Sequence, residues 1–202
     1  MSFSINAWPI RCGPYFSFQY RSAFNIYTGV RFADLLNVDF DPASGMIRML
    51  DLRALLPDTP DEVMQQVYAD HGRKHEFQEQ YGHLEIDDLR WEKFEEIAEN
   101  LAQCTCYPEF RRFIEIRRGF SEEFAERGWS CVDVRPAVAA HWEKTKTWLT
   151  PPVFLSGTLL NQIPKYHLVE GHSRMAVLLG SLDQGLLPPN SKHQLWLGRI
   201  YP

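Results

Sequence analysis

The pattern of apolar and polar positions is most regular near the C-terminal end of the chain. An alternating apolar run, residues 166–169, ends at Glu170, and Gly171 follows it. After His172 and Ser173, a second apolar segment begins at Arg174 and continues to Leu179. A short run that ends at a glycine and is followed by a longer apolar segment predicts a strand leading directly into a helix. We expect the fold to be organised around this corner.

Short apolar runs and helical segments alternate around the corner in the C-terminal third. The pattern predicts a strand at residues 131–134, a helix at 137–148, a strand at 151–157, the strand and helix of the corner, and a last strand at 194–200. Pro151 and Pro152 suit the entry of a strand, because proline cannot donate to the ladder. We therefore expect an α/β unit over residues 129–202.

The first 128 residues predict a strand-rich segment followed by helices. The first fifty residues are rich in aromatic and β-branched types, which favours a small antiparallel arrangement, with a turn at 41–45 and a further strand at 46–52. A helix should begin with Thr59 as N-cap and end at Gly72. Apolar positions at helical spacing predict another helix at 87–104, and further helices follow Pro108 and span 121–127. We expect this N-terminal α+β portion to share one core with the C-terminal unit.

Composition and charge narrow the class of protein. The chain is 45% hydrophobic and 23% charged, which is typical of a soluble globular protein. Its net charge of -5 disfavours direct binding to nucleic acid or to anionic membranes and would suit a basic partner. The first residues do not resemble a secretory signal, and we expect a cytoplasmic protein.

Metal sites are not predicted. The four cysteines lack the paired spacing of a zinc site. His71 and His75 are four residues apart, as helical metal ligands can be, but Gly72 lies between them and the sequence offers no third ligand.

The corner itself has the chemistry of an anion site. The first backbone N–H groups of a helix have no intrahelical partner and carry positive partial charge, so phosphates bind there readily. Gly171 allows a close approach of the backbone, Ser173 is a suitable N-cap, and His172 and Arg174 add hydrogen-bond donors. The alternative is a tight turn with a capping serine and two solvated polar residues.

The C-terminal third resembles the ParB/sulfiredoxin-like superfamily, which shares a strand ending in a Gly-x-x-Arg corner. The resemblance covers roughly residues 129–202 and rests on three stretches, 152–155, 167–176 and 195–199. It implies that Gly171, His172, Ser173 and Arg174 bind nucleotide phosphates and that Glu170 orients a substrate hydroxyl or a metal ion. Residues 1–128 have no counterpart that we can name.

Two departures from the superfamily exclude its best-known activities. Sulfiredoxins carry a cysteine directly after the glycine, where this chain has His172, so sulfinate reduction by that thiolate is excluded. ParB proteins carry paired arginines at the corner and a helix-turn-helix domain after it. Here Ser173 replaces one arginine and the sequence stops at Pro202, so chromosome or plasmid segregation is not expected.

Two functions remain open at this point. The first is binding of a nucleotide such as ATP, ADP or CTP with Mg²⁺, or of another phosphorylated small molecule. If the protein is an enzyme, it would be a phosphotransferase or NTPase, with Glu170 and His172 as catalytic candidates. The second is an acidic immunity protein or antitoxin that neutralises a basic nuclease toxin. A Ser/His hydrolase is not indicated, because no Gly-x-Ser-x-Gly motif is present.

Overall fold

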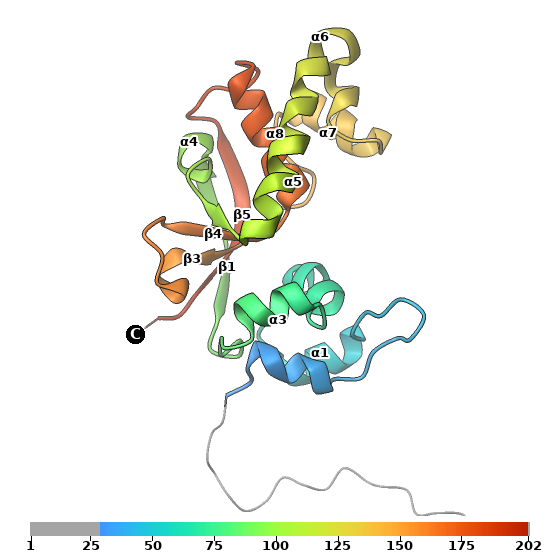
Figure 1. The fold of residues 1–202 in the computed structure, drawn as a ribbon, viewed down its shortest axis with the longest axis vertical. Coiled ribbons are helices and arrows are strands. Elements are labelled where there is room, and N and C mark those ends of the chain that lie inside the picture. Colours follow the sequence, from blue (N-terminus) through green and yellow to red (C-terminus); the bar gives the residue numbers. More distant parts are fainter. Residues whose placement is uncertain (1–28, 202) are drawn as a thin grey trace, which may run out of the picture.

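A mixed five-stranded sheet forms the centre of the protein (Figure 1). The computed structural model describes residues 29–201, and its sheet has the strand order β1-β5-β3-β4-β2. The strands are β1 (Arg90–Ile97), β2 (Thr105–Cys106), β3 (Val153–Ser156), β4 (Tyr166–Glu170) and β5 (Lys192–Arg199). Two pairs are antiparallel, β1 with β5 and β3 with β4, and two are parallel, β3 with β5 and β2 with β4. The predicted α/β fold class is confirmed.

The sheet separates two hydrophobic cores. Side chains alternate between the two faces of a strand, so neighbours on β3, β4 and β5 enter different cores. Val153, Val169 and Trp196 pack with the helices that precede β1. Phe154 and Leu168 pack on the other side, with the helices that follow β2. Because both faces are covered, the three central strands read as nearly continuous apolar runs.

The helices form two groups, one on each side of this sheet (Figure 1). The first group contains the 3-10 helix η1 (Phe32–Asn37), α1 (Met49–Leu55), α2 (Asp61–Val63), its π-helical continuation η2 (Met64–Ala69) and α3 (His75–Tyr81). The second contains α4 (Ala98–Leu101), α5 (Pro108–Arg118), α6 (Phe124–Arg127), α7 (Pro136–Thr145) and α8 (His172–Asp183). Short 3-10 segments, η3 (Gly119–Glu123), η4 (Gly128–Cys131) and η5 (Gly157–Leu160), connect these elements.

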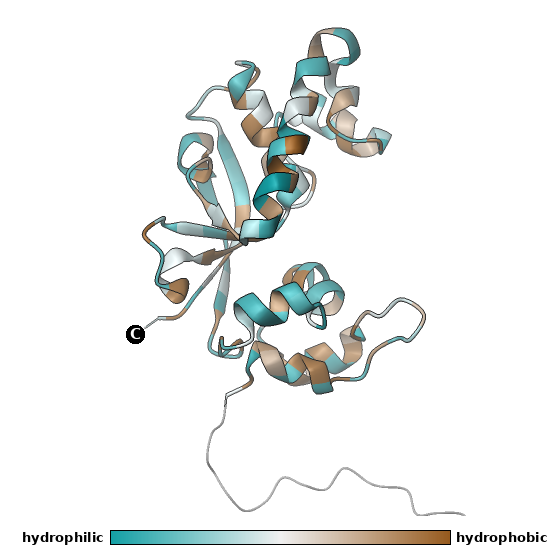
Figure 2. Cartoon of the chain, viewed as in Figure 1, coloured by the Kyte–Doolittle hydropathy of each residue, from teal (hydrophilic) through white to brown (hydrophobic). Residues whose placement is uncertain are grey.

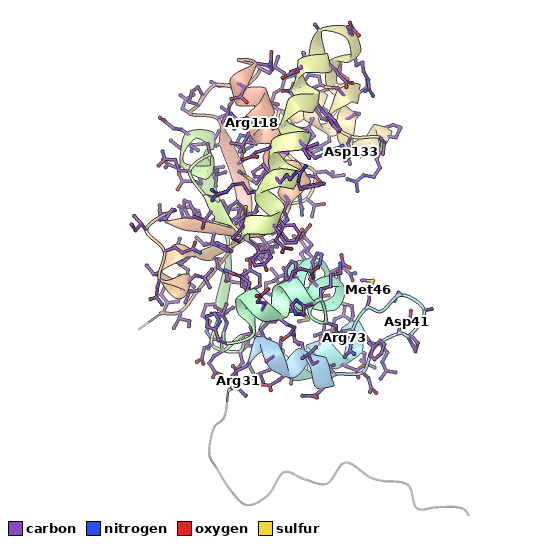
Figure 3. All side chains as sticks on the ribbon, in the orientation of Figure 1. Arg31, Asp41, Met46, Arg73, Arg118 and Asp133 are labelled. Carbon is purple, nitrogen blue, oxygen red and sulfur yellow. The ribbon has the colours of Figure 1, made fainter. Side chains whose placement is uncertain are left out.

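Helices α5 and α8 lie side by side in the second group (Figure 1). Gly180 of α8 permits this approach, because a Cβ atom there would lie 2.6 Å from the carbonyl oxygen of Arg118. An ion pair between Arg118, labelled in Figure 3, and Asp183 joins the two helices. Figure 2 shows hydrophilic and hydrophobic stretches along α5, as expected of a helix with one face on the core.

The predicted helix at residues 87–104 is wrong over most of its length. The segment is strand β1, which pairs with β5 from Arg90 opposite Arg199 to Ile97 opposite Lys192, and only α4 is helical. Trp91 packs toward one core and Phe94 toward the other. Trp91 and Phe94 are three residues apart, and an odd separation puts two side chains on opposite faces of a strand. Apolar residues at this separation therefore fit a strand buried on both faces as well as one face of a helix. The charged residues of this segment, Glu92, Lys93, Glu95 and Glu96, lie on an edge strand, where charged side chains are common.

Two predicted strands are also wrong. Residues 46–52 contain the start of α1, where Leu52 is buried and Leu50 is 76% exposed, as on a helix with one buried face. Residues 131–134 form no strand; Val132 instead donates its N–H to the Trp129 carbonyl at the end of η4. The strands expected before residue 29 lie outside the described residues.

Other elements agree with the sequence. The turn at 41–45 is present, beginning at Asp41, which is labelled in Figure 3. Gly45 has φ +73°, and the Asp41 carboxylate accepts from the Ala43 N–H. The helix predicted before Gly72 is present from Asp61, but its predicted cap is wrong, because Pro60 and not Thr59 is the N-cap residue and no side chain caps the helix. The helix predicted at 137–148 is α7, which ends at Thr145. The strands and helix around the corner are found as β3, β4, α8 and β5.

The sheet takes strands from both sides of residue 128. Strands β1 and β2 precede this residue, and they pair with β5 and β4, which follow it. Over residues 29–201, no helix is both long and apolar enough to cross a membrane.

Candidate functional site

The corner between β4 and α8 has the predicted strand-to-helix geometry. Strand β4 ends at Glu170, Gly171 adopts φ +109° as the N-cap residue, and α8 begins at His172. This φ strongly favours glycine. A Cβ atom at Gly171 would also lie only 2.5 Å from the Cβ atom of Pro152. Because Gly171 has no side chain, the corner can pack against Pro152 at the entry of β3.

The predicted N-cap role of Ser173 is wrong. Ser173 is the second residue of α8, and no side-chain hydrogen bond caps this helix. The helix begins two residues earlier than expected, because the backbone turns at Gly171, which is the N-cap residue and has no side chain to cap with. The first N–H groups of α8 are consequently left for water or a ligand.

Arg174 joins the corner to the segment before β3 by hydrogen bonds. Its Nη1 atom donates to the carbonyl oxygens of Thr150, at 2.9 Å, and Pro151, at 3.3 Å, and its Nη2 atom lies 3.3 Å from Glu170 Oε1. Burial lowers the pKa of this guanidinium, and the negative charge of Glu170 opposes that effect. Direct pairing of Arg174 with a phosphate would require some of these contacts to be exchanged.

Glu170 lies at the centre of the corner's charged groups. Its Oε2 atom is 3.3 Å from His71 Nε2 and 3.7 Å from His172 Nδ1, while Oε1 faces Arg174. Burial acts to raise the pKa of this carboxyl, but hydrogen bonding from His172 and His71 and the charge of Arg174 outweigh it, so the pKa lies well below its usual range. Glu170 is therefore ionised at neutral pH.

His71 belongs to this site, although the sequence did not indicate it. It follows η2, and its ring stacks on Phe77 with a centroid distance of 4.3 Å. The Lys74 ammonium donates to His71 Nδ1 at 2.9 Å. Because an ammonium group has no acceptor, Nδ1 must accept, and the ring proton is placed on Nε2, which faces Glu170. His75, the residue that seemed a natural partner of His71, is exposed.

The corner opens on a cavity of about 680 Å³. This volume is within the range of small-molecule sites. One part of the wall is polar and includes Gln66 and residues 170–174; a second polar group is the Asp133–Arg135 ion pair, in which Asp133 is labelled in Figure 3. The remaining wall is largely apolar and aromatic, formed by Phe110, Phe113, Val132, Val138, Trp142, Trp148, Leu149 and Val177.

Two residues that line the cavity carry a buried polar atom without a hydrogen-bond partner. The side chain of His172 is 8% exposed and packs against the ring of Phe110 at a centroid distance of 4.3 Å, and its Nε2 atom has no hydrogen-bond partner. Gln66 Nε2 donates to the Pro151 carbonyl at 3.2 Å, but Gln66 Oε1 is buried without a partner. Buried polar groups are nearly always paired, so each such atom calls for an explanation.

The chemistry available at the corner is anion binding and proton transfer. In the part of the chain that the structure describes, no group of three or more His, Cys, Asp and Glu side chains is arranged to hold a metal ion. A carboxylate beside one imidazole nitrogen favours the tautomer with its proton there and leaves the other nitrogen as acceptor. The charge of Glu170, whose Oε2 atom is 3.7 Å from His172 Nδ1, favours the neutral tautomer with its proton on Nδ1 and its lone pair on Nε2.

Two further histidines are buried away from the cavity. His167 on β4 makes 2.8 Å hydrogen bonds with the Tyr81 hydroxyl and with Thr105 Oγ1, which joins α3 to the sheet. His193 on β5 bonds with Thr147 at 2.8 Å and with Ser191 at 3.0 Å. Burial lowers the pKa of each ring to about 4; for His167 the charge of His172 adds to the effect. Both rings are neutral components of the fold.

Comparisons of the chain with protein-family models, with curated proteins and with solved structures find no match.

Proposed function

We propose that the protein binds a nucleotide or another phosphorylated small molecule in the corner cavity. The observation that carries the proposal is that the uncapped N-terminus of α8, a helix of 12 residues, opens on a cavity of about 680 Å³. Free N–H groups and the helix dipole attract a phosphate to this position. The aromatic and aliphatic wall offers a surface for the apolar part of the same ligand.

The charge of Glu170 is compatible with an anion at the helix N-terminus. Its carboxylate is compensated by Arg174 at 3.3 Å and by the Nε2–H of His71 at 3.3 Å. We therefore expect the helix terminus to keep a positive local potential. Mg²⁺ would enter with the phosphates of a nucleotide, as it commonly does when the protein offers no complete set of ligands.

This proposal agrees with what the resemblance to the ParB/sulfiredoxin-like superfamily implies. We propose the same relationship for the unit formed by β3, β4, α8 and β5, with Gly171, His172, Ser173 and Arg174 around the phosphates. Under this proposal Gly171 brings the backbone close to the ligand and the first N–H groups of α8 bind it.

A thermal-shift panel with ATP, ADP and CTP, each with and without Mg²⁺, tests the proposal. A ligand present at 100 times its Kd stabilises a protein by about 2.7 kcal/mol. For a chain of this size, that corresponds to a rise in Tm of roughly 5–11 °C. Tm values that stay constant with all three nucleotides at millimolar concentration would contradict nucleotide binding.

The variant Ser173→Asp separates loss of the ligand from damage to the fold. A negative charge in the first turn of a helix is favourable by about 0.3–1 kcal/mol, so the ligand-free protein should keep its Tm. The same charge would repel a phosphate at the corner and abolish the shift. Gln65→Glu is the matched control, because Gln65 is exposed outside the cavity lining and the variant changes the net charge by the same amount.

A further inference from the structure

The charged and amide side chains that line the cavity already bond with one another or with the backbone. Arg135 donates to both carboxylate oxygens of Asp133, at 2.8 and 2.7 Å. Arg174 donates to two carbonyl oxygens and to Glu170, and the Gln66 amide donates to a third backbone contact, the carbonyl oxygen that precedes β3. A ligand that bonded these groups would have to replace existing contacts.

The two unpartnered atoms, Gln66 Oε1 and His172 Nε2, add no binding group, because both are buried and expose no surface to the cavity. The groups suited to a charged ligand are therefore the first N–H groups of α8. A polar ligand group placed against the apolar wall would lose its hydrogen bonds to water without replacement.

Helices α5 and α8 run parallel, which gives the order of groups along the cavity (Figure 1). Phe110 of α5 packs on His172 at the start of α8, with ring centroids 4.3 Å apart. Eight residues later in each helix, the Arg118 carbonyl lies against Gly180. Both helices therefore lead away from the N-terminus of α8 in the same direction.

Further apolar side chains line the cavity about one turn beyond that N-terminus. Val177 follows Arg174 by three residues, which is about 4.5 Å along the helix axis. Phe113 of α5, Val138 of α7 and Leu149 line the same cavity, and Phe113 is 42% and Leu149 52% exposed. Exposed apolar side chains that gather at one place mark a binding surface, whereas scattered ones need no explanation.

We propose that the ligand of this cavity is a phosphate monoester of an apolar alcohol, with its phosphate at the N-terminus of α8 and its hydrocarbon body against Phe113, Val177 and Leu149. The inference rests on the proposed function, since the phosphate at α8 places the body. It adds the chemical class of the rest of the ligand and the residues that bind it. The phosphates of a nucleotide can occupy the same helix N-terminus, so ATP remains a probe of that position.

Calorimetric titrations with ethyl, butyl and hexyl phosphate test the hydrocarbon contacts. Each CH₂ group that becomes fully buried should tighten binding about fourfold, so hexyl phosphate should bind at least about tenfold more tightly than ethyl phosphate. Ribose 5-phosphate carries a polar body, and it should bind at least about tenfold more weakly than hexyl phosphate.

Failure of this inference differs from failure of the proposed function. Equal affinities for ethyl, butyl and hexyl phosphate would overturn the apolar body while leaving phosphate binding in place. Tighter binding of ribose 5-phosphate than of hexyl phosphate would also overturn it. Absence of binding for all four probes and for ATP would overturn both proposals.

Two variants locate the effect on the cavity wall. Phe113→Gln and Leu149→Gln should each reduce the ratio of hexyl to ethyl phosphate affinity by at least about threefold, because each removes apolar contact area. The affinity for ethyl phosphate should stay unchanged. Leu50→Gln is the matched control, because Leu50 is 76% exposed on α1 outside the cavity lining, and it should leave the ratio unchanged. An unchanged ratio in both cavity variants would overturn the assignment, and the use of two exposed positions guards against one that fails to fold.

Intermolecular NOEs give the position of the hydrocarbon directly. The terminal methyl group of bound hexyl phosphate should show NOEs to the ring protons of Phe113 and to the methyl groups of Val177. NOEs only to residues outside the cavity would overturn the proposal.

Discussion

Acid should destabilise the protein through its two buried histidines. His167 is 0% exposed and His193 is 1% exposed, and burial lowers the pKa of each to about 4, against 6.5 in an unfolded chain. Between these values the unfolded state binds protons that the folded state does not. Stability from this source is therefore complete above pH 6.5 and is lost as the pH falls toward 4.

The magnitude follows from the two pKa values. Inside this window, each histidine contributes a slope of the free energy of unfolding that approaches about 1.4 kcal/mol per pH unit. Between pH 7.5 and pH 5, the two histidines together should therefore lower the free energy of unfolding by about 4 kcal/mol. The depressed pKa values of Glu170 and Glu96 act at lower pH, because an unfolded glutamate titrates near 4.3.

Urea unfolding at pH 7.5, 6.5, 5.5 and 5.0 measures this slope directly. The variant His193→Gln should lower the stability at pH 7.5 and reduce the slope by about half, since only His167 then contributes. His83→Gln is the matched control, because His83 is exposed, and it should leave the slope unchanged. A free energy of unfolding that stays constant from pH 7.5 to 5.0 would refute the reasoning.

Two substitutions test the geometry of the corner itself. Gly171→Ala should lower the free energy of unfolding by more than about 2 kcal/mol, because a φ of +109° is strained for alanine and its Cβ would clash with Pro152. Gly185→Ala, at φ +67° in open space, should cost only about 1 kcal/mol, and equal losses in the two urea titrations would contradict the clash. Arg174→Met should destabilise by about 3 kcal/mol, because the largely buried carboxylate of Glu170 then loses its only arginine partner and keeps only the neighbouring histidines. The double variant with Glu170→Gln should recover part of that loss, and no recovery in a double-mutant cycle would contradict the pairing.

The corner could be predicted because its signals are local. An alternating run, a glycine and a following apolar segment occupy consecutive positions, and the backbone at Gly171 makes the expected turn. Only the cap was misplaced, at Ser173, because the sequence did not show at which residue the helix begins. The flanking strands β3 and β5 were found for the same reason, as short apolar runs buried on both faces.

The elements that were missed depend on contacts distant in sequence. Strand β1 contains glutamates and a lysine that suit a helix, and it is extended because β5 offers it a full-length partner. His71 reaches Glu170 only because η2 packs against the sheet. A contact between residues so far apart in sequence cannot be predicted from a local pattern. The unpaired acceptors of Gln66 and His172 are likewise properties of packing.

The measurement that tests the central claim most directly is a ¹H–¹⁵N NMR titration of the protein with ATP and Mg²⁺. It reports both whether the nucleotide binds and where. The account predicts that the largest shift changes occur at the backbone amides of His172, Ser173 and Arg174, at the start of α8, and saturate with a single Kd. Saturable changes confined to other parts of the protein, or no changes at millimolar ATP, would contradict it.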